Sequence, residues 1–308
     1  MLEVKNLTKK FKQRTVLDGI NLNVSEGEVF GYLGPNGAGK TTTMRVILGL
    51  MEPTSGHALL WGKRASESAD VRSRVGVLLE SDGLYPRLSA HDNLDYFAQL
   101  YGVKDRQTRV AQLLDFAGLT ARSRDRVGNY SRGMRRKLGL VRALLHSPDL
   151  LMLDEPSAGL DPEAQKMVRD LIVTLSGESK ITVFLSSHDL DEVQRICGRV
   201  AILQRGRIRV CDTLKALQGS GRSADVEIVL IDTGRTDEAV RLLLAQPGVT
   251  AVTREDTAIT VSLRDEHGVG LAASALESAG IGVEVVRRSR RSLEEIYLEV
   301  VREESRSE

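Results

Sequence analysis

The chain has 308 residues, 41% of them hydrophobic, and its 43 basic residues nearly balance 42 acidic ones. This length predicts about two domains with a core in each. The balanced charge excludes a global electrostatic attraction to nucleic acid or to a membrane surface. No run approaches the ~18 consecutive apolar residues of a membrane span.

The N-terminus lacks the apolar core of a signal peptide, so we expect a soluble, intracellular protein that meets any membrane through a partner. The two cysteines, Cys197 and Cys211, lack metal-type spacing and are expected to be inert thiols. The first predicted strands run from Leu2 to Leu7 and from Thr15 to Val24. Between them, Phe11 stands among charged residues. An exposed aromatic ring there can stack on a nucleobase, but a phenylalanine packed at a sheet edge has the same pattern, so the residues alone leave both readings open.

The next predicted strand, Val29 to Leu33, runs into a glycine-rich loop and a helix from Thr41 to Leu50. The loop fits the pattern G-x-x-x-x-G-K-[ST], in which backbone N–H groups and the helix start bind phosphate oxygens. In this pattern Lys40 supplies positive charge to the β- and γ-phosphates, and the Thr41 hydroxyl ligates Mg²⁺. The sequence therefore predicts a nucleoside-triphosphate site at Gly34, Pro35, Asn36, Gly37, Ala38, Gly39, Lys40, Thr41 and Thr42.

A helical region at about residues 89–147 follows two further short strands, the second of which ends at Glu80. Its expected helices run from Ser89 to Tyr101, from Arg106 to Ala117 and from Arg135 to His146. The last of them is opened by Tyr130, Ser131, Arg132, Gly133 and Met134. Serine and glycine at a helix start can bind an anion, although a plain serine N-cap has the same pattern.

Two carboxylates, Asp154 and Glu155, follow the buried apolar strand Leu150 to Leu153. Beside a phosphate loop, this position places Asp154 near Mg²⁺, and Glu155 can take a proton from an attacking water. A tight loop then ends at Asp161, before the helix Pro162 to Leu175. His188 follows a later strand, at the sheet edge where open α/β folds bind ligands.

Residues 219–223, Gly-Ser-Gly-Arg-Ser, are the best linker in the chain. Beyond them the pattern restarts in the order β-α-β-β-α-β, which suggests a small ferredoxin-like α+β domain. A final helix begins at Ser292, where Ser292 and Glu295 form a capping box. We expect the apolar face of this helix either to pack only on the sheet of its own domain or also to brace a dimer. Arg287, Arg288, Arg290 and Arg291 precede it, as a solvated turn or an anion-binding cluster. We therefore divide the chain into a nucleotide-binding domain at 1–218 and an accessory or dimerisation domain at 222–308.

Taken together, these motifs resemble the ATP-binding subunit of an ABC (ATP-binding cassette) transporter, an α/β P-loop NTPase fold with a helical subdomain. The resemblance covers about residues 1–217. The last third resembles the C-terminal extension of drug, antibiotic and ion exporters, on its closing residues Ser-Leu-Glu-Glu-Ile-Tyr-Leu.

The resemblance implies a role for each motif. Phe11 stacks on adenine, Glu155 is the general base, and His188 contacts the γ-phosphate. Thr41, Glu80 and Asp154 ligate Mg²⁺. Ser131, Arg132, Gly133 and Met134 form the signature, which closes over ATP held by the other subunit, and Asp161 lies at the dimer seam.

Three positions depart from the family pattern. The signature reads Tyr-Ser-Arg-Gly-Met rather than Leu-Ser-Gly-Gly-Gln, Glu80 stands where glutamine is usual, and Phe11 replaces the commoner tyrosine. Glu80 can still offer oxygen to Mg²⁺ but adds a negative charge.

The leading hypothesis is an ATPase that dimerises on ATP and drives an exporter of drug, antibiotic or ion type. It would act on a separately encoded membrane permease from the inner face of the membrane, with ATP and Mg²⁺ as cofactors and no direct nucleic-acid partner. One alternative is a cytosolic ABC ATPase acting on ribosomes or DNA. The single set of motifs and the 91 residues between Lys40 and Ser131 argue against it. A third possibility makes the C-terminal domain a ligand sensor that regulates the ATPase.

Overall fold

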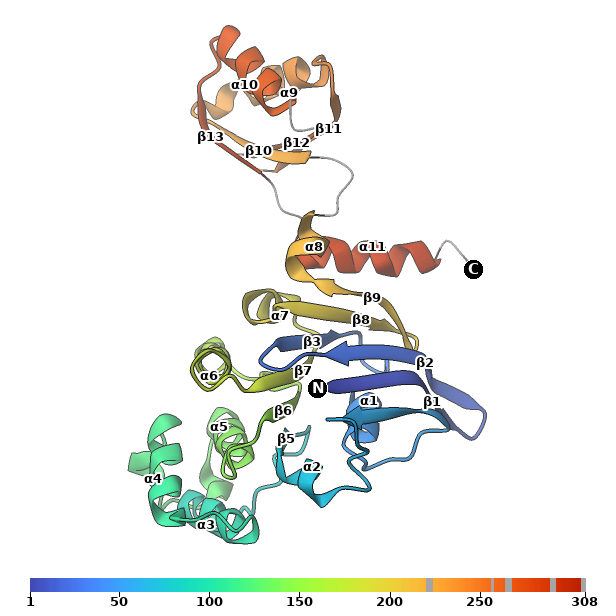
Figure 1. Ribbon diagram of the computed structural model, residues 1–308. Coiled ribbons are helices and arrows are strands. Elements are labelled where there is room, and N and C mark those ends of the chain that lie inside the picture. The colour runs from blue at the N-terminus through green and yellow to red at the C-terminus, as the bar shows by residue number, and fades with distance from the viewer. Residues whose placement is uncertain (220–223, 256–257, 264–267, 289–291, 306–308) are drawn as a thin grey trace. The chain divides into compact units, whose positions relative to one another are not determined.

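The computed structural model describes residues 1–219, 224–255, 258–263, 268–288 and 292–305 (Figure 1). The chain forms two compact units. The first comprises Met1–Leu214 together with the end of the chain from Tyr297, and the second comprises Lys215–Ile296. The predicted linker residues 220–223, His267, and Arg290 and Arg291 of the arginine cluster lie outside the described residues.

A six-stranded sheet forms the centre of the first unit, in the order β5-β6-β7-β3-β8-β9. Its strands are β3 (Val29–Leu33), β5 (Val75–Leu78), β6 (Leu150–Asp154), β7 (Thr182–Ser187), β8 (Arg199–Gln204) and β9 (Arg207–Thr213). All neighbours are parallel except β8 and β9. Every residue of β6 and β7 is buried, which explains why these strands are nearly continuous apolar runs.

A second, antiparallel sheet has the order β2-β1-β4. It consists of β1 (Leu2–Phe11), β2 (Arg14–Val24) and β4 (Ser55–Leu60). β1 is longer than expected because it continues into a tight hairpin in which Phe11 pairs with Arg14. Both sheets bury their apolar faces in one core with helix α1 (Lys40–Ile47), to which Met44 and Ile47 contribute. This core fixes the start of α1 beneath the phosphate loop.

Helices α3 (Ala90–Leu100), α4 (Arg106–Phe116) and α5 (Arg132–Ala143) gather at the β5 end of the sheet (Figure 1). Ser89 caps α3 by accepting a hydrogen bond from the Asp92 backbone. The predicted start of α5 was too late, because Ser131 is its N-cap. The remaining helices of this unit are α2 (Ala69–Ser73), α6 (Pro162–Ser179), α7 (Leu190–Ile196) and α8 (Leu214–Gly219), the last of which continues beyond the unit boundary.

The second unit contains the predicted order β-α-β-β-α-β. Its elements are β10 (Ala224–Leu230), α9 (Thr236–Leu244), β11 (Val249–Glu255), β12 (Ala258–Leu263), α10 (Gly268–Ser278) and β13 (Val283–Arg288). The strands form an antiparallel sheet in the order β11-β12-β10-β13. Ile228, Ile259 and Val261 pack with Leu243 and Leu276 of the helices in a core of their own.

Helix α11 (Leu293–Ser305) follows β13. The capping box is confirmed: the Ser292 backbone donates to Glu295 Oε2 at 3.0 Å, and the Glu295 backbone donates to Ser292 Oγ at 3.1 Å. The boundary between the two units falls inside this helix, between Ile296 and Tyr297.

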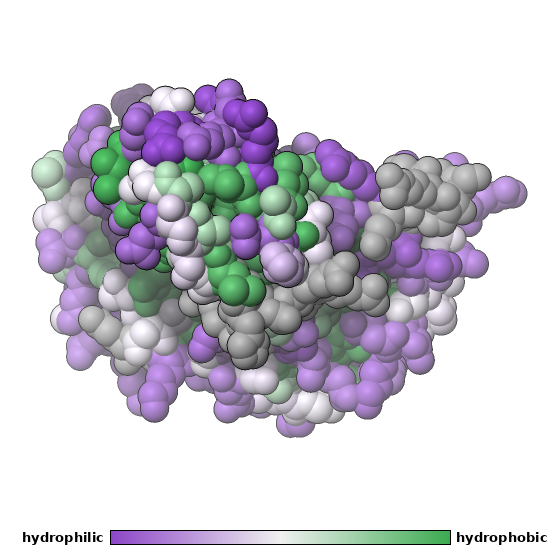
Figure 2. Space-filling model, turned by 90° about the horizontal axis from the view of Figure 1, so that it is seen from above, coloured by the Kyte–Doolittle hydropathy of each residue, from purple (hydrophilic) through white to green (hydrophobic). Residues whose placement is uncertain are grey.

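Large apolar side chains of the second unit stay exposed, among them Ile231, Leu244 and Leu271. Figure 2 shows apolar residues gathered in one region of a molecular face, with hydrophilic residues beside them. Within the described part of the chain, no helix combines the length and the apolar character that crossing a membrane requires.

Candidate functional site

The phosphate loop leaves β3 at Leu33 and returns as α1 at Lys40. Gly37 and Gly39 adopt positive φ angles of 80° and 115°, a region that side chains strain. A Cβ on Gly34 would lie 2.4 Å from the Leu203 carbonyl oxygen, and one on Gly39 would lie 2.6 Å from Leu17 Cδ2. The loop therefore requires glycine at these positions for its curvature and for its close packing against β2 and β8.

Parallel register brings the other candidate segments to the same edge of the sheet as this loop. Leu33 of β3 pairs with Ser187 of β7, and Ser186 of β7 pairs with Asp154 of β6. β5 joins the same edge through the pairing of Leu78 with Leu153. Carboxyl ends of neighbouring parallel strands are where open α/β sheets bind ligands.

Lys40 is 6% exposed, and its amine is anchored inside the loop. It donates to the Gly34 carbonyl at 2.6 Å and lies 3.1 Å from Glu155 Oε1. The ammonium group is therefore held where the loop encloses it, with a carboxylate as its ion-pair partner.

Asp154 is 1% exposed and is held by two hydroxyl groups. Thr41 Oγ1 donates to its Oδ2 at 2.7 Å, and Ser186 Oγ donates to its Oδ1 at 2.5 Å. The predicted partners Thr41 and Asp154 thus lie together, and a hydroxyl beside a carboxylate is the hard oxygen set that Mg²⁺ prefers.

Glu155 links the loop to His188. Its Oε2 lies 2.8 Å from His188 Nδ1, while its Oε1 faces Lys40. Its backbone has a φ of 49°, and its N–H is bonded to the Ser186 carbonyl at 3.1 Å. A non-glycine residue in this conformation is uncommon and is frequent at functional sites.

Phe11 ends β1 with its ring 44% exposed, and Lys9 Nζ lies 5.1 Å from the ring centroid. A cavity of about 350 Å³ opens beside the phosphate loop, lined by residues 14–16, 35–38 and 204–206. Phe11 lies on the same β-hairpin, two residue pairs beyond Lys9, and does not itself line this cavity. The ring is therefore exposed to solvent at a position where a ligand can stack on it.

The signature residues contact the loop before α6 rather than the phosphate loop of the same chain. Ser131 Oγ accepts from the Met134 backbone at 3.2 Å. A Cβ on Gly133 would lie 3.1 Å from Ala164 Cβ, and the exposed Arg132 guanidinium covers Gly159. Asp161 caps α6 by accepting from the Ala164 backbone at 2.9 Å. Glu80 is exposed, and within the described part of the chain it makes no hydrogen bond or ion pair with Thr41 or Asp154.

Sequence reasoning missed three residues around this edge. Ser186 holds Asp154, Arg136 of α5 binds the backbone after β6, and the buried Glu192 carboxylate accepts from Ser157 Oγ and from Ser187 Oγ. Burial raises the pKa of Glu192. The Ser-Ser pair directly before His188 was the one available sequence signal.

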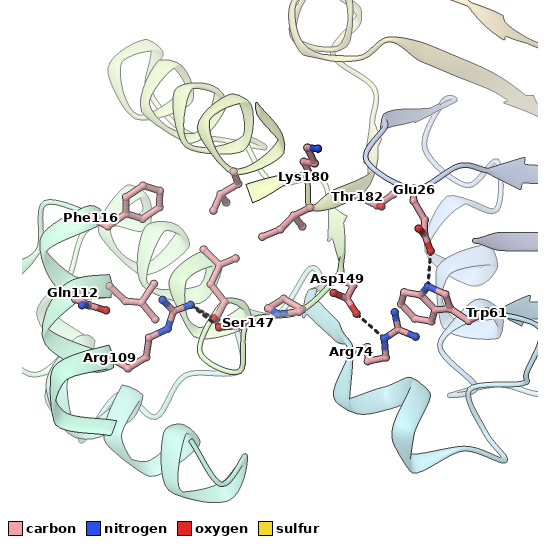
Figure 3. A pocket seen from close by; sticks show the side chains of 15 residues that line it. Glu26, Trp61, Arg74, Arg109, Gln112, Phe116, Ser147, Asp149, Lys180 and Thr182 are labelled. Carbon is pink, nitrogen blue, oxygen red and sulfur yellow. Dashed lines mark hydrogen bonds and ion pairs between the residues drawn. The ribbon is translucent and has the colours of Figure 1, made fainter. Parts of the chain in front are cut away.

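Another cavity, of about 590 Å³, lies elsewhere, at the amino ends of β6 and β7 (Figure 3). Two pairs of its polar groups are bonded to each other: Arg74 with Asp149 at 2.6 Å, and Trp61 Nε1 with Glu26 at 3.1 Å. Arg109 donates to the Leu144 carbonyl at 2.7 Å. The cavity therefore lies where α4 packs against the sheet, and it is not the candidate site.

The chain is similar in sequence to a known protein family and to known ATP-binding proteins. The family model described as ABC transporter matches residues 17–158. The linearmycin resistance ATP-binding protein LnrL of Bacillus subtilis is 32% identical over 91% of this chain and 90% of its own length. The bacitracin transport ATP-binding protein BcrA of Bacillus licheniformis is 39% identical over 68% of each chain.

Solved structures lead to the same family. A dimeric ATP-binding cassette in a post-hydrolysis state, bound to ADP and Pi, superposes with a TM-score of 0.64 at 25% identity. The match covers 69% of this chain and 98% of that one. The chain therefore belongs to the ABC transporter family, as one of its ATP-binding, ATP-hydrolysing proteins.

Proposed function

We propose that this ATPase drives an exporter of the drug or antibiotic type through a separately encoded membrane permease, at the inner face of the membrane. The names of BcrA and LnrL support this, because one concerns bacitracin transport and the other linearmycin resistance. LnrL also matches across nine-tenths of this chain, well beyond the ATP-binding region. We further propose that residues 222–308 act as an accessory, ferredoxin-like domain.

The single observation that carries the catalytic proposal is the cluster of Lys40, Thr41, Asp154, Glu155 and His188 at one sheet edge. When bound, Mg²⁺ neutralises developing charge on the transferred phosphoryl group. Thr41 and Asp154 would hold it, with Glu80 as a further oxygen donor. Lys40 would bind the β- and γ-phosphates within the loop from Gly34 to Thr42, and Phe11 would stack on the adenine.

Glu155 is the proposed general base and His188 its orienting neighbour. A base must be held so that it faces the attacking water, and Glu155 is held on both carboxylate oxygens, by Lys40 and by His188. Phosphates that neutralise Lys40 would release one of these oxygens for the water. His188, whose side chain is 54% exposed, would keep Nδ1 on Glu155 and contact the γ-phosphate through its other ring nitrogen.

We propose that two chains close over ATP, with Ser131, Arg132, Gly133 and Met134 of one chain meeting the nucleotide of the other and Asp161 at the seam. Ser131 is exposed at the N-terminus of α5, and a helix N-terminus is a favourable place for an anion. The dimeric cassette bound to ADP and Pi supports this arrangement.

The test of the base is Glu155→Gln. The amide cannot accept the proton of the attacking water, so we expect hydrolysis to fall by at least ~100-fold while ATP binding is retained. Glu163→Gln, which changes an exposed carboxylate in the first turn of α6, is the matched control and should hydrolyse ATP normally. A Glu155→Gln enzyme with near-normal turnover would remove Glu155 from this role.

The same variant tests the dimer. Glu155→Gln with ATP should give a dimer in light scattering, and adding Ser131→Arg should abolish it. A strict monomer under ATP would count against closure of two identical chains over ATP, or would mean that the natural partner is a different cassette. Co-purification with a membrane protein, rather than with ribosomes or DNA, separates the exporter from the cytosolic alternative.

A further inference from the structure

Arg136 lies one turn into α5, and its guanidinium group binds four backbone carbonyl groups. Nε donates to Pro156 O at 2.9 Å, Nη1 to Leu79 O at 2.9 Å, and Nη2 to Glu155 O at 2.8 Å. Nη2 also donates to Asp154 O. Three of these carbonyl groups are consecutive, and they belong to the turn that carries Asp154 and Glu155.

This cation has no carboxylate among its hydrogen-bond partners in the described part of the chain. Burial lowers its pKa, while the charges of Asp154, Asp82 and Glu155 raise it. An arginine stays protonated even so. Burying a guanidinium group without a bonded carboxylate costs free energy. Ion pairing therefore does not explain why Arg136 is buried here.

The hydrogen bonds of Glu155 supply that reason. The peptide group between Asp154 and Glu155 is bound at both ends, by Arg136 at its carbonyl and by the Ser186 oxygens at its N–H. The next peptide group is bound by Arg136 at the Glu155 carbonyl. Both peptide planes next to Glu155 are therefore set from outside, which holds its left-handed conformation with a φ of 49°.

We propose that Arg136 is a positioning residue for ATP hydrolysis, which fixes the turn after β6 so that the Glu155 carboxylate faces the phosphate loop. The proposal rests on the role of Glu155 as the base. A guanidinium group is suited to the task because it offers five N–H donors in a rigid plane. A lysine has one ammonium group on a flexible stem and cannot hold four carbonyl groups in that geometry.

Arg142 provides a matched control on the same helix. It is also largely buried, and burial lowers its pKa as well. It donates to one carbonyl, Val77 O at 2.9 Å, and lies over the Phe97 ring at 5.0 Å from its centroid. Substitution of Arg142 therefore reports the cost of losing a buried arginine of α5 that does not touch the turn after β6.

The experiment compares Arg136→Gln, Arg136→Lys and Arg142→Gln in the full chain, by kcat, KM and Kd for Mg-ATP and by Tm. We expect both Arg136 variants to lose at least about 10-fold in kcat with Kd changed by less than about 3-fold, which is the pattern of an interaction needed for the chemical step. Arg142→Gln should lower Tm comparably and keep kcat within about 2-fold.

Three results would overturn the proposal: normal kcat in Arg136→Gln, an equal loss of kcat in Arg142→Gln, or a loss of kcat that follows loss of ATP affinity. Failure of both Arg136 variants to fold while Arg142→Gln folds would also overturn it, because the role of Arg136 would then be in folding and not in positioning Glu155.

A double-mutant cycle separates this proposal from the role of Glu155. In the Glu155→Gln background, Arg136→Lys should cause no further loss of the residual rate, because both changes remove the same positioned carboxylate. Multiplying losses would show that Arg136 acts elsewhere. Near-normal activity of Glu155→Gln alone would instead disprove the base, independently of Arg136.

Discussion

Phe11 presents an exposed ring at the end of β1, near a cavity beside the phosphate loop. Stacking of a base on an aromatic ring contributes about 1–3 kcal/mol, so we expect Phe11→Ala to weaken ATP binding by roughly 5- to 150-fold. Equilibrium titration with a fluorescent ATP analogue measures this loss, and Tm should be nearly unchanged because the ring is not in the core.

Phe116→Ala is the control for this prediction. Its ring is similarly exposed, at 39%, but lies on α4 beside the other cavity. Equal ATP affinity of the Phe11→Ala and wild-type proteins would mean that the ring packs at the sheet edge only.

Single residues were predictable where a motif fixes both residue type and spacing. Lys40 and Thr41 follow from the glycine pattern, and Asp154 and Glu155 follow from an apolar strand that ends in two carboxylates. Ser186 was not predictable in the same way, because a serine inside a strand becomes a partner of Asp154 only through the register of β6 and β7. Arg136 likewise resembles any charged helix residue until α5 is packed against the turn after β6.

His146 follows α5 and joins this helix to β5 and α3. Its Nε2 lies 3.2 Å from the Val75 carbonyl, and its ring centroid lies 4.6 Å from that of Tyr101. Burial lowers the pKa of His146, and the charges of Arg109 and Arg142 lower it further, against the hydrogen bond to Val75. The folded protein therefore holds His146 neutral at pH values where the unfolded chain already binds a proton.

This difference makes stability depend on pH. The contribution is fully present above the unfolded pKa of about 6.5 and is lost as the pH falls towards the lower folded pKa. We expect the free energy of unfolding to drop between pH 7.5 and 5.5 by up to about 1 kcal/mol more in wild type than in His146→Gln, since solvent screens a partly exposed group. Urea titrations at both pH values measure it, and equal pH dependence in the two proteins would exclude His146 as the cause.

Among the helices, the long ones were predictable and the short ones were missed. The long strands and helices carry two or more periods of apolar residues, whereas α2 and α7 have five and seven residues and were not expected. The pairing of β1 with β4 lies outside any local pattern, because it joins strands that are separated along the chain by β2, β3 and α1. Such strand pairings depend on which apolar faces are buried together when the whole core forms.

The whole molecule consists of two units, and α11 is shared between them in sequence. All residues of the proposed site lie between Phe11 and His188, so we expect a chain that ends at Gly219 to bind ATP with full-length affinity. That chain also lacks the part of α11 that belongs to the first unit. A variant that keeps α11 and replaces residues 220–291 by a glycine-serine linker should therefore melt higher than the truncation, by roughly 2–5 °C.

Sedimentation of both variants with ATP then tests whether the second unit braces the dimer. Its exposed Ile231, Leu244 and Leu271 are candidates for such a contact. Weaker ATP-dependent dimerisation in both variants would support bracing, whereas loss of ATP binding by a folded truncation would show that the C-terminal third completes the nucleotide site.

The place of β3 has a consequence for synthesis on the ribosome. β3 lies between β7 and β8, so the strand that leads into the phosphate loop has no neighbour in its sheet until residues 182–204 have been made. The loop emerges early, but the nascent chain cannot close it, because parallel pairing waits for the distant partners. An unfinished chain released before β7 would thus carry the whole glycine-rich sequence and neither bind nor hydrolyse ATP.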